Sequence, residues 1–262
     1  MNKTKWIMAA LMAAGVAQAA TVYFDDFQDD AIGAKPVIGA GNTGSSNAIY
    51  GTVSIQANPK SSGNTSTQVS RGGGKAVDSN RIYGYFNGGA QPIDGMTFSY
   101  DFYSTGTTNA NNGVRFGLMQ TAGFTGQNGD CYIRFDPSCF VRIDAVKQNK
   151  KSYGSDVWQH FTGTLTATDL TTRTYNLVWT LRNLETVASI SGTNSIVFSD
   201  DFSNGLAAAV IAEVVDTDDE ATDAYSYIDN IEVLATPKPI TLGMLRVKAP
   251  VFKILLPKVP FG

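Results

Sequence analysis

The chain reads as short apolar runs separated by turns, without the long 3.6-residue periodicity of amphipathic helices. In Met96–Tyr103 every second residue is apolar, as expected of a strand with one buried face. Val114–Met119 repeats this pattern, with Arg115 on the opposite face. The same reasoning predicts further strands at Thr21–Phe27, Tyr50–Gln56, Arg81–Phe86, Phe140–Val146, Trp158–Leu165, Thr174–Leu181 and Ala224–Val233.

The spacing of these runs predicts an all-β protein. About a dozen short strands, punctuated by Gly, Ser, Thr and Asn, are typical of two antiparallel sheets packed face to face. Only Gly205–Val215 could also be a helix. Its valines and isoleucine favour a buried strand, which is our prediction. The Gly-rich and Ser-rich stretch Gly33–Gly51 is predicted to be a loop.

The last predicted strand, Ala224–Val233, does not keep a single phase. Its two tyrosines share a face with Val233, whereas Ile228 falls on the other face. A β-bulge at Asp229 and Asn230 would restore the phase and turn the Asp229 carboxylate toward a neighbouring strand. We expect that neighbour to be the first strand, so that the two ends of the domain meet.

Three segments resemble secreted concanavalin A-like (LamG-like) jelly rolls. They are Asp25-Asp26-Phe27 with the following Gly33, the final strand Tyr227–Val233, and the aromatic strand that begins at Trp158. The resemblance implies a two-sheet antiparallel jelly-roll sandwich of the concanavalin A-like type over residues 20–235.

The first 19 residues have the features of a secretory signal peptide. Lys3 and Lys5 precede an apolar run, and the small-residue sequence Ala17-Gln-Ala19 predicts cleavage before Ala20. The apolar run is shorter than a membrane span requires. We therefore expect a bacterial protein that is secreted or held at the cell surface.

Residues 236–262 form a basic tail that contains several prolines. Pro237-Lys238-Pro239 resembles the start of a PEP-CTERM sorting signal, which continues in that family with a transmembrane helix and terminal arginines. Here cations and prolines interrupt the apolar stretch, so no stable membrane span is expected after signal cleavage. We interpret the tail as disordered and as a degraded sorting signal.

Charge is distributed unevenly along the chain. The net charge is -3, with 20 basic and 23 acidic residues. Seven of the basic residues lie in the leader and the tail, which leaves 13 basic against 23 acidic residues in the body, or about -10. Such a body repels phosphate backbones, and nucleic acid is not an expected partner.

The only two cysteines, Cys131 and Cys139, flank a predicted turn at Asp136–Ser138. Because export permits disulfides, we predict that they form a disulfide that pins a hairpin. Two free buried thiols are the alternative. Arg134 and Arg142 straddle the same hairpin and could approach each other across it.

Aromatic side chains are the candidates for ligand contacts, since rings stack on the apolar faces of sugars. A sandwich core would use the same residue types, so burial is the alternative for each of them. The candidate ligand-binding residues are Tyr83, Tyr85, Tyr103, Trp158 and Trp179.

No cofactor is required by the sequence, but a structural calcium is a candidate. If the chain ends meet, Asp25 or Asp26 could share a hard cation with Asp229. The acidic run Asp216–Asp223 lacks the glycine and glutamate of an EF-hand, and we interpret it as a solvated loop with loose calcium binding as the alternative.

Catalytic signals are weak. His160 is the only histidine, and no Gly-Xaa-Ser-Xaa-Gly nucleophile motif occurs. Asp101 and Asp144 are the least ordinary acids, but nothing marks them as a glycosidase pair. We predict a non-catalytic module that binds an extracellular polysaccharide or cell-envelope glycan, or is structural. The alternatives are a polysaccharide hydrolase, a lyase that uses cations such as Arg115 beside a tyrosine base, or a protein-adhesion module.

Overall fold

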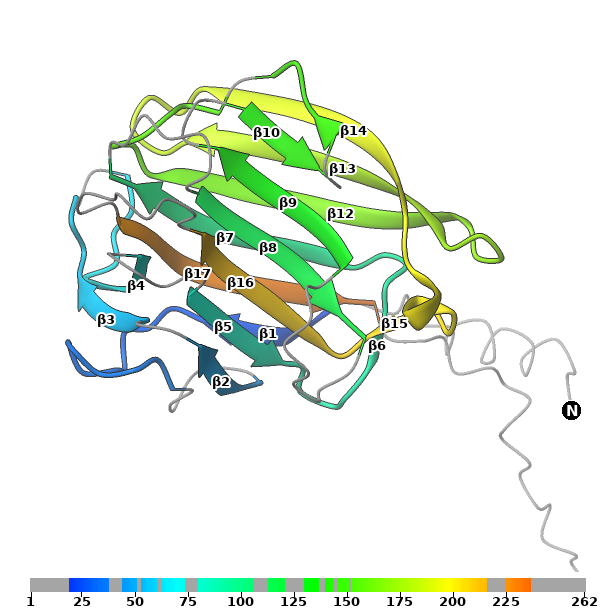
Figure 1. Cartoon of the computed structure of the whole chain (residues 1–262), viewed down its shortest axis with the longest axis horizontal. Helices are drawn as coiled ribbons and strands as arrows, with labels where there is room; N and C mark the ends of the chain where they lie inside the picture. The colour runs from blue at the N-terminus through cyan, green and yellow to red at the C-terminus, as the bar shows by residue number, and fades with distance from the viewer. Residues whose placement is uncertain are drawn as a thin grey trace, which may run out of the picture.

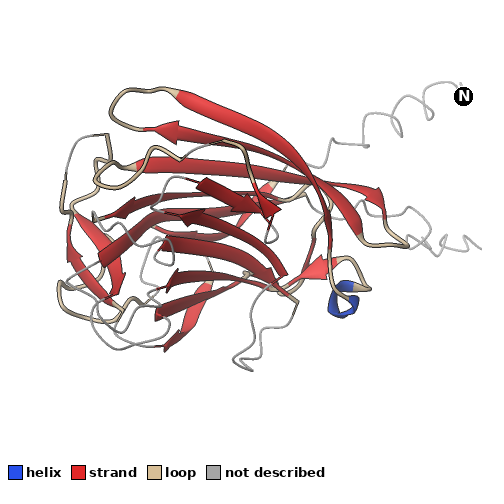
Figure 2. Ribbon diagram, turned by 45° about the horizontal axis from the view of Figure 1, so that its top comes forward, coloured by secondary structure: helices blue, strands red, loops and turns tan. Residues whose placement is uncertain are grey.

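A computed structural model describes most of the chain between residues 19 and 236. The described ranges are 19–37, 44–50, 53–60, 63–73, 80–105, 113–120, 130–136, 140–143, 146–150, 152–215 and 225–236. The fold is a two-sheet antiparallel jelly-roll sandwich of the concanavalin A-like type (Figure 1). Apart from one short 3-10 turn, η1 (Asp200–Phe202), the described chain is strand and loop (Figure 2). The all-β prediction is confirmed.

The eight-stranded sheet carries the first and last described strands and the longest hairpins. Its order is β14 (Ser189–Val197), β13 (Thr174–Asn183), β12 (Gln159–Asp169), β7 (Thr97–Ser104), β17 (Tyr225–Ala235), β4 (Gln68–Gly73) and β3 (Ser54–Ala57), and β1 (Ala20–Asp25) also pairs with β17.

The seven-stranded sheet forms the other layer, and a small pair of strands lies beside it. Its order is β11 (Val146–Lys147), β10 (Phe140–Ile143), β9 (Asp130–Asp136), β8 (Gly113–Met119), β16 (Ala209–Val215), β5 (Asn80–Tyr85) and β2 (Ser45–Tyr50), and β15 (Leu206–Ala207) pairs with β6 (Gln91–Pro92).

Aromatic rings from both sheets fill the space between the layers. Phe98 and Tyr100 of β7 stack on Phe116 of β8, with ring centroids 5.2 Å and 4.7 Å apart, respectively. Phe161 of β12 also packs against both β7 rings. The alternation seen in the sequence thus turns one face of each strand into the core, where large rings contribute most of the buried apolar surface.

The two ends of the fold pair as predicted. Ala20 of β1 lies opposite Ala235 of β17, and Asp25 lies opposite Ile231. The predicted bulge is also present: the pairing of β17 with β7 shifts register between Asp229 and Glu232, and Asn230 adopts a positive φ of 49°. After the bulge, the strand returns its aliphatic residues to the core.

Three further segments show how local sequence became secondary structure. Gly205–Val215 forms strands β15 and β16, not a helix. The hairpin of β9 and β10 is present, with Phe140 opposite Asp136. The loop prediction for Gly33–Gly51 was wrong in part, because Ser45–Tyr50 forms strand β2. Polar residues can occupy this strand since it lies at a sheet edge. In the described part of the chain, no helix has the length and apolarity to cross a membrane.

Gly84 of β5 illustrates how closely the two sheets approach. A Cβ atom at this position would overlap the ring of Tyr23 on β1, which is fully buried. We expect Gly84→Ala to lower the free energy of unfolding by about 1–3 kcal/mol through overpacking. Urea denaturation measures the effect. The same substitution in a Tyr23→Leu background should cost less, and an equal cost in both backgrounds would contradict this explanation.

Candidate functional site

A row of charged positions crosses the seven-stranded sheet. In the strand register, each position of the row lies directly opposite the next one on the neighbouring strand. We call this set the cationic row, because five of its six members are basic. From β5 to β11 it comprises Arg81, Glu213, Arg115, Arg134, Arg142 and Lys147.

The cationic row lies on the face of the sheet that points away from the core. Arg81 precedes Ile82 and Arg115 precedes Phe116, and both of these apolar neighbours belong to the main core. Because side chains alternate between the two faces of a strand, the row occupies the outer face. The Arg81 and Arg115 side chains are half-buried. Arg81 Nη1 donates a hydrogen bond to Tyr83 Oη, at 3.5 Å.

Three arginine positions are consecutive in this row. Arg115 lies opposite Arg134, and Arg134 lies opposite Arg142. The expectation that Arg134 and Arg142 face each other across the hairpin is therefore confirmed for the backbone register. The backbone register therefore places three positions of one charge sign side by side on neighbouring strands.

The five aromatic residues named as candidate sugar contacts are all buried. Tyr83 and Tyr85 pack with Met119 in a small apolar cluster, Tyr103 and Trp158 pack together in another, and Trp179 belongs to the main core. Their exposed fractions range from 0% to 8%. All five rings are therefore buried, Trp179 in the main core and the other four in the two smaller clusters, which agrees with the alternative stated for each of them.

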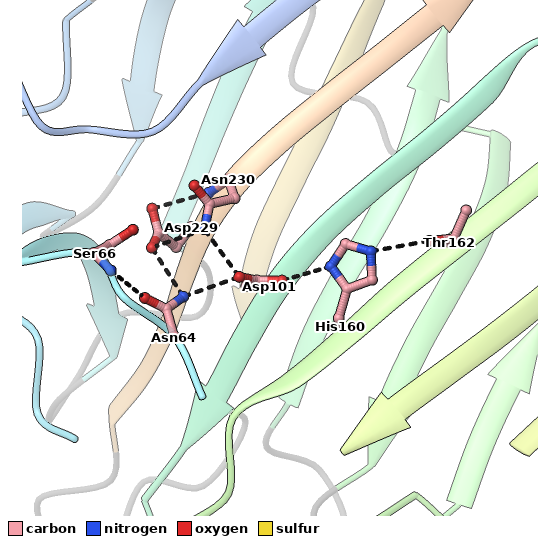
Figure 3. Close-up of polar contacts among 7 residues, drawn as sticks. All are labelled: Asn64, Ser66, Asp101, His160, Thr162, Asp229 and Asn230. Atoms are coloured by element: carbon pink, nitrogen blue, oxygen red, sulfur yellow. Dashed lines mark hydrogen bonds and ion pairs between the residues drawn. The ribbon is translucent and has the colours of Figure 1, made fainter. Parts of the chain in front are cut away.

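A polar network covers the outer face of the other, eight-stranded sheet (Figure 3). The register places His160 of β12, Asp101 of β7 and Asp229 of β17 side by side. His160 Nδ1 lies 2.6 Å from Asp101 Oδ1, and His160 Nε2 lies 3.0 Å from Thr162 Oγ1. With Asp101 as acceptor, Nδ1 carries the proton, and Nε2 of the neutral ring accepts from the Thr162 hydroxyl.

Two asparagines join the two carboxylates of this network. Asn64 Nδ2, from the connection between β3 and β4, donates to Asp101 Oδ2 and Asp229 Oδ2, both at 3.0 Å. Asn230 Nδ2 donates to the same oxygens at 2.9 Å and 3.3 Å. The amide oxygen of Asn64 accepts from the Ser66 backbone N–H, which fixes the orientation of the amide. We call the seven residues labelled in Figure 3 the buried carboxylate network; they are Asn64, Ser66, Asp101, His160, Thr162, Asp229 and Asn230.

The buried carboxylate network is closed to a polymeric substrate. Asp229 is 0% exposed, Asp101 6% and Asn64 2%. Burial raises the pKa of Asp229 to about 7, and the Asp101 charge acts in the same direction, whereas hydrogen bonds from Ser66 and Asn64 oppose the rise. A glycosidase needs two carboxylates that flank an accessible bond. These two instead face each other under a loop, with their oxygens occupied by amides.

The acids of the predicted calcium site each bind nearby backbone or amide groups. Phe27 N–H donates to Asp25 Oδ1 at 3.0 Å, and Gln28 N–H donates to Asp26 Oδ1 at 3.2 Å. Among the residues that the structure describes, no group of three or more His, Cys, Asp or Glu side chains could hold a metal. The calcium site of Asp25, Asp26 and Asp229 therefore stays a prediction, without a gathered set of ligands.

Some residues of these two sites could not be selected from the sequence, and some predictions lie outside the described residues. Arg81 and Asn64 had no distinguishing sequence signal, because strand pairing sets Arg81 opposite Glu213 and the connection between β3 and β4 brings Asn64 to Asp101 and Asp229. The predictions outside the described residues concern Cys139 and hence the disulfide, Asp144, the acidic run, the leader and the basic tail.

The fold defines a concanavalin A-like jelly-roll protein. No family model matches the chain, and no curated protein matches it. Among solved structures, it is similar to the PL-14 alginate lyase from Aplysia kurodai, with 13% identity over 83% of this chain and 100% of that one, and a TM-score of 0.55.

The comparison with solved structures also found two further similar chains. A Shewanella oneidensis protein of unknown function is 16% identical over 90% of this chain and 94% of that one, with a TM-score of 0.51. Lectin I from Ulex europaeus is 15% identical over 83% of this chain and 98% of that one, with a TM-score of 0.44. Identities this low establish the fold alone.

Proposed function

We propose that this protein is an exported, non-catalytic module that binds an acidic polysaccharide on the outer face of its seven-stranded sheet. The observation that carries the proposal is the cationic row, in which three arginine positions stand in direct register. The secretory leader supports a location outside the bacterial cytoplasm, where such polymers occur.

The geometry of a sheet suits a ligand with repeated negative charges. Neighbouring strands lie about 4.8 Å apart, so the four consecutive basic positions from Arg115 to Lys147 repeat at short, regular intervals, whereas Glu213 separates Arg115 from Arg81. Guanidinium groups bind carboxylates through paired, charge-assisted hydrogen bonds. One polymer chain lying across the strands could thus contact several members of the row.

Two further points support this ligand class. The same fold carries an alginate lyase, so the architecture is compatible with an acidic polysaccharide. The body as a whole is acidic, with a net charge of about -10 when the leader and tail are set aside, so five basic positions in one row stand out against it. Because salt screens exposed charges, binding should weaken as ionic strength rises.

The arrangement favours binding over catalysis. His160, the only histidine, lies on the eight-stranded sheet rather than in the cationic row, and it is hydrogen-bonded to Asp101 and Thr162. The acid pair of Asp101 and Asp229 is buried under Asn64. Within the part of the chain that the structure describes, the pair of Asp101 and Asp229 and the imidazole of His160 therefore lie on the other sheet, away from the row.

Replacing Arg115 by glutamine should weaken binding to alginate by about ten- to a hundredfold, because a charge-assisted hydrogen bond contributes about 1.5–3 kcal/mol. Arg182→Gln is the matched control. Arg182 is exposed on the outer face of β13, opposite His160, and belongs to the other sheet. Its loss should leave the affinity unchanged. Titration calorimetry with alginate, polygalacturonate and neutral dextran measures all three affinities.

Three results would reject the proposal. They are equal affinity for dextran and the acidic polymers, equal losses for the Arg115 and Arg182 variants, or no binding to any of these polymers. The last result would favour the protein-adhesion alternative. Release of unsaturated uronate, followed by ultraviolet absorbance, would instead establish a lyase and contradict the non-catalytic assignment.

A further inference from the structure

Strand β14 is an edge strand that lacks the usual protection against pairing. It is nine residues long, and in the described structure it pairs only with β13 (Figure 1). Natural edge strands are kept from pairing by charges, prolines, bulges or short length. β14 contains no charged residue and no proline, and its pairing with β13 shows no register shift.

The other edge strands in the described chain each carry such a device. β3 has four residues, and β11 has two and ends in a lysine. β2 has a register shift between Ser46 and Ala48. β1 has a shift between Thr21 and Tyr23, and its Val22 carbonyl accepts from the Asn87 backbone N–H. β14 is therefore distinguished by length, regularity and lack of charge.

The outward backbone groups of β14 can be assigned. Phe198 N–H donates to the Arg173 carbonyl, and Asn183 N–H donates to the Ala188 carbonyl, so the even-numbered residues bond toward β13. In an antiparallel pair, alternate residues point their N–H and C=O groups away from the partner strand. The outward set is therefore Ser189, Ser191, Thr193, Ser195 and Val197, all of which have exposed side chains.

Apolar side chains are also exposed around this edge. Val178 lies opposite Thr193 on β13, Val187 lies in the turn between the two strands, and Val197 ends β14. Their exposed fractions are 53%, 61% and 58%, respectively. The hairpin thus combines unpaired backbone groups with apolar surface, and the strand that forms its edge has no charge to hinder an approaching chain.

We infer that β14 pairs antiparallel with β14 of a second copy of this chain, joining two eight-stranded sheets into one continuous sheet. Thr193 is the central residue of the strand. A two-fold axis at Thr193 would set Ser189 opposite position 197 of the second copy, and Ser191 opposite its position 195. The outward N–H and C=O groups of both strands would then form hydrogen bonds with each other.

A second copy fits this edge better than an unrelated strand for two reasons. It brings an edge of the same length, and its serine and threonine hydroxyls both donate and accept hydrogen bonds, so the surface is self-complementary. The acidic bodies of two copies repel each other at most contacts. They can approach where the surface is uncharged.

The test is the mass of the full chain in solution. Sedimentation equilibrium from about 1 to 100 μM should give a mass that rises to two chains. Thr193→Pro removes an outward N–H without breaking a bond to β13, so it should weaken association at least about tenfold while the variant stays folded by circular dichroism.

A second pair of variants separates edge pairing from general surface effects. Thr193→Lys places a charge on the edge, and Thr180→Lys places the same charge one strand inward, opposite Ser191. Only the first should reduce dimerisation. Hydrogen exchange of the peptide 189–197 should also slow as protein concentration rises. A monomer throughout the concentration range, or a dimer unaffected by both Thr193 variants, would overturn the inference.

Discussion

Replacing Asp101 by alanine is expected to lower the free energy of unfolding by about 3 kcal/mol. The substitution removes the acceptor of three hydrogen bonds, from His160 Nδ1, Asn64 Nδ2 and Asn230 Nδ2. Buried donors left without partners cost about 1–3 kcal/mol each. Relief of the repulsion between Asp101 and Asp229 offsets part of this loss.

Thr162→Val is the control for this prediction. Thr162 is half-exposed and forms the last hydrogen bond of the network, to His160 Nε2. Water can replace the lost hydroxyl there, so the cost should stay below about 1 kcal/mol. Guanidinium denaturation at neutral pH measures both variants. Equal costs for the two, or a cost below 1 kcal/mol for Asp101→Ala, would show that the network does not stabilise the fold.

Stability should fall as pH rises from about 4 to 8, and Asp25 should contribute much of the change. Burial raises the pKa of Asp25 from its ordinary value of 3.8 to about 8. The hydrogen bond from Phe27 N–H opposes this rise, and the charges of Asp30, Asp29 and Asp26 add to it. The folded state therefore holds a proton that the unfolded state releases. The stabilisation is complete below pH 3.8 and is lost as pH rises to about 8. The raised pKa of Asp229 acts in the same direction.

Asp25→Asn should make this pH profile less steep. An asparagine keeps the acceptor for Phe27 N–H and is neutral at every pH, as the protonated acid is. A carboxyl that is protonated in the folded state and ionised in the unfolded state changes the free energy of unfolding by about 1.4 kcal/mol per pH unit. The slope of stability against pH should therefore be shallower in the variant by up to that amount. At pH 8 the variant should be more stable than the parent by a few kcal/mol. Urea denaturation at several pH values gives the slopes.

Asp26→Asn provides the matched comparison for Asp25→Asn. Asp26 accepts an equivalent hydrogen bond from Gln28 N–H but is only half-buried. Its replacement removes only the last and smallest of the causes that raise the pKa of Asp25, so most of the parental slope of stability against pH should remain. If Asp25→Asn keeps the parental slope, burial of this carboxyl is not the source of the pH dependence.

These experiments address three regions with separate roles. The buried carboxylate network and Asp25 stabilise the sandwich, the cationic row is the proposed ligand face, and β14 is the proposed contact with a second copy. Variants of Asp101 and Asp25 should therefore change unfolding. Variants of Arg115 should change ligand affinity, and variants of Thr193 should change association. A substitution that affects all three measurements would indicate loss of folding rather than of one site.

The sequence determined many of the strands and the buried face of several, but not β2, β4 or β14. The alternation in Met96–Tyr103 identified the core side of β7, and the broken phase of the last strand located the bulge at Asp229 and Asn230. Local periodicity and turn residues carry this information, because an antiparallel strand with one solvated face must alternate. The pairing of the chain ends could also be predicted, from the resemblance of both ends to jelly rolls.

Only the tertiary structure decided which residues became neighbours across strands. The sequence places Arg81, Arg115 and Arg142 far apart, and the strand register alone sets them in one row. It likewise brings Asn64 over Asp101 and Asp229. The sequence could not predict whether the candidate tyrosines and tryptophans are buried, for the same reason. An aromatic ring on a strand suits a core and a surface equally well, and the elements that pack over it decide which it becomes. Contacts between distant strands depend on register and sheet order, which a local pattern does not encode.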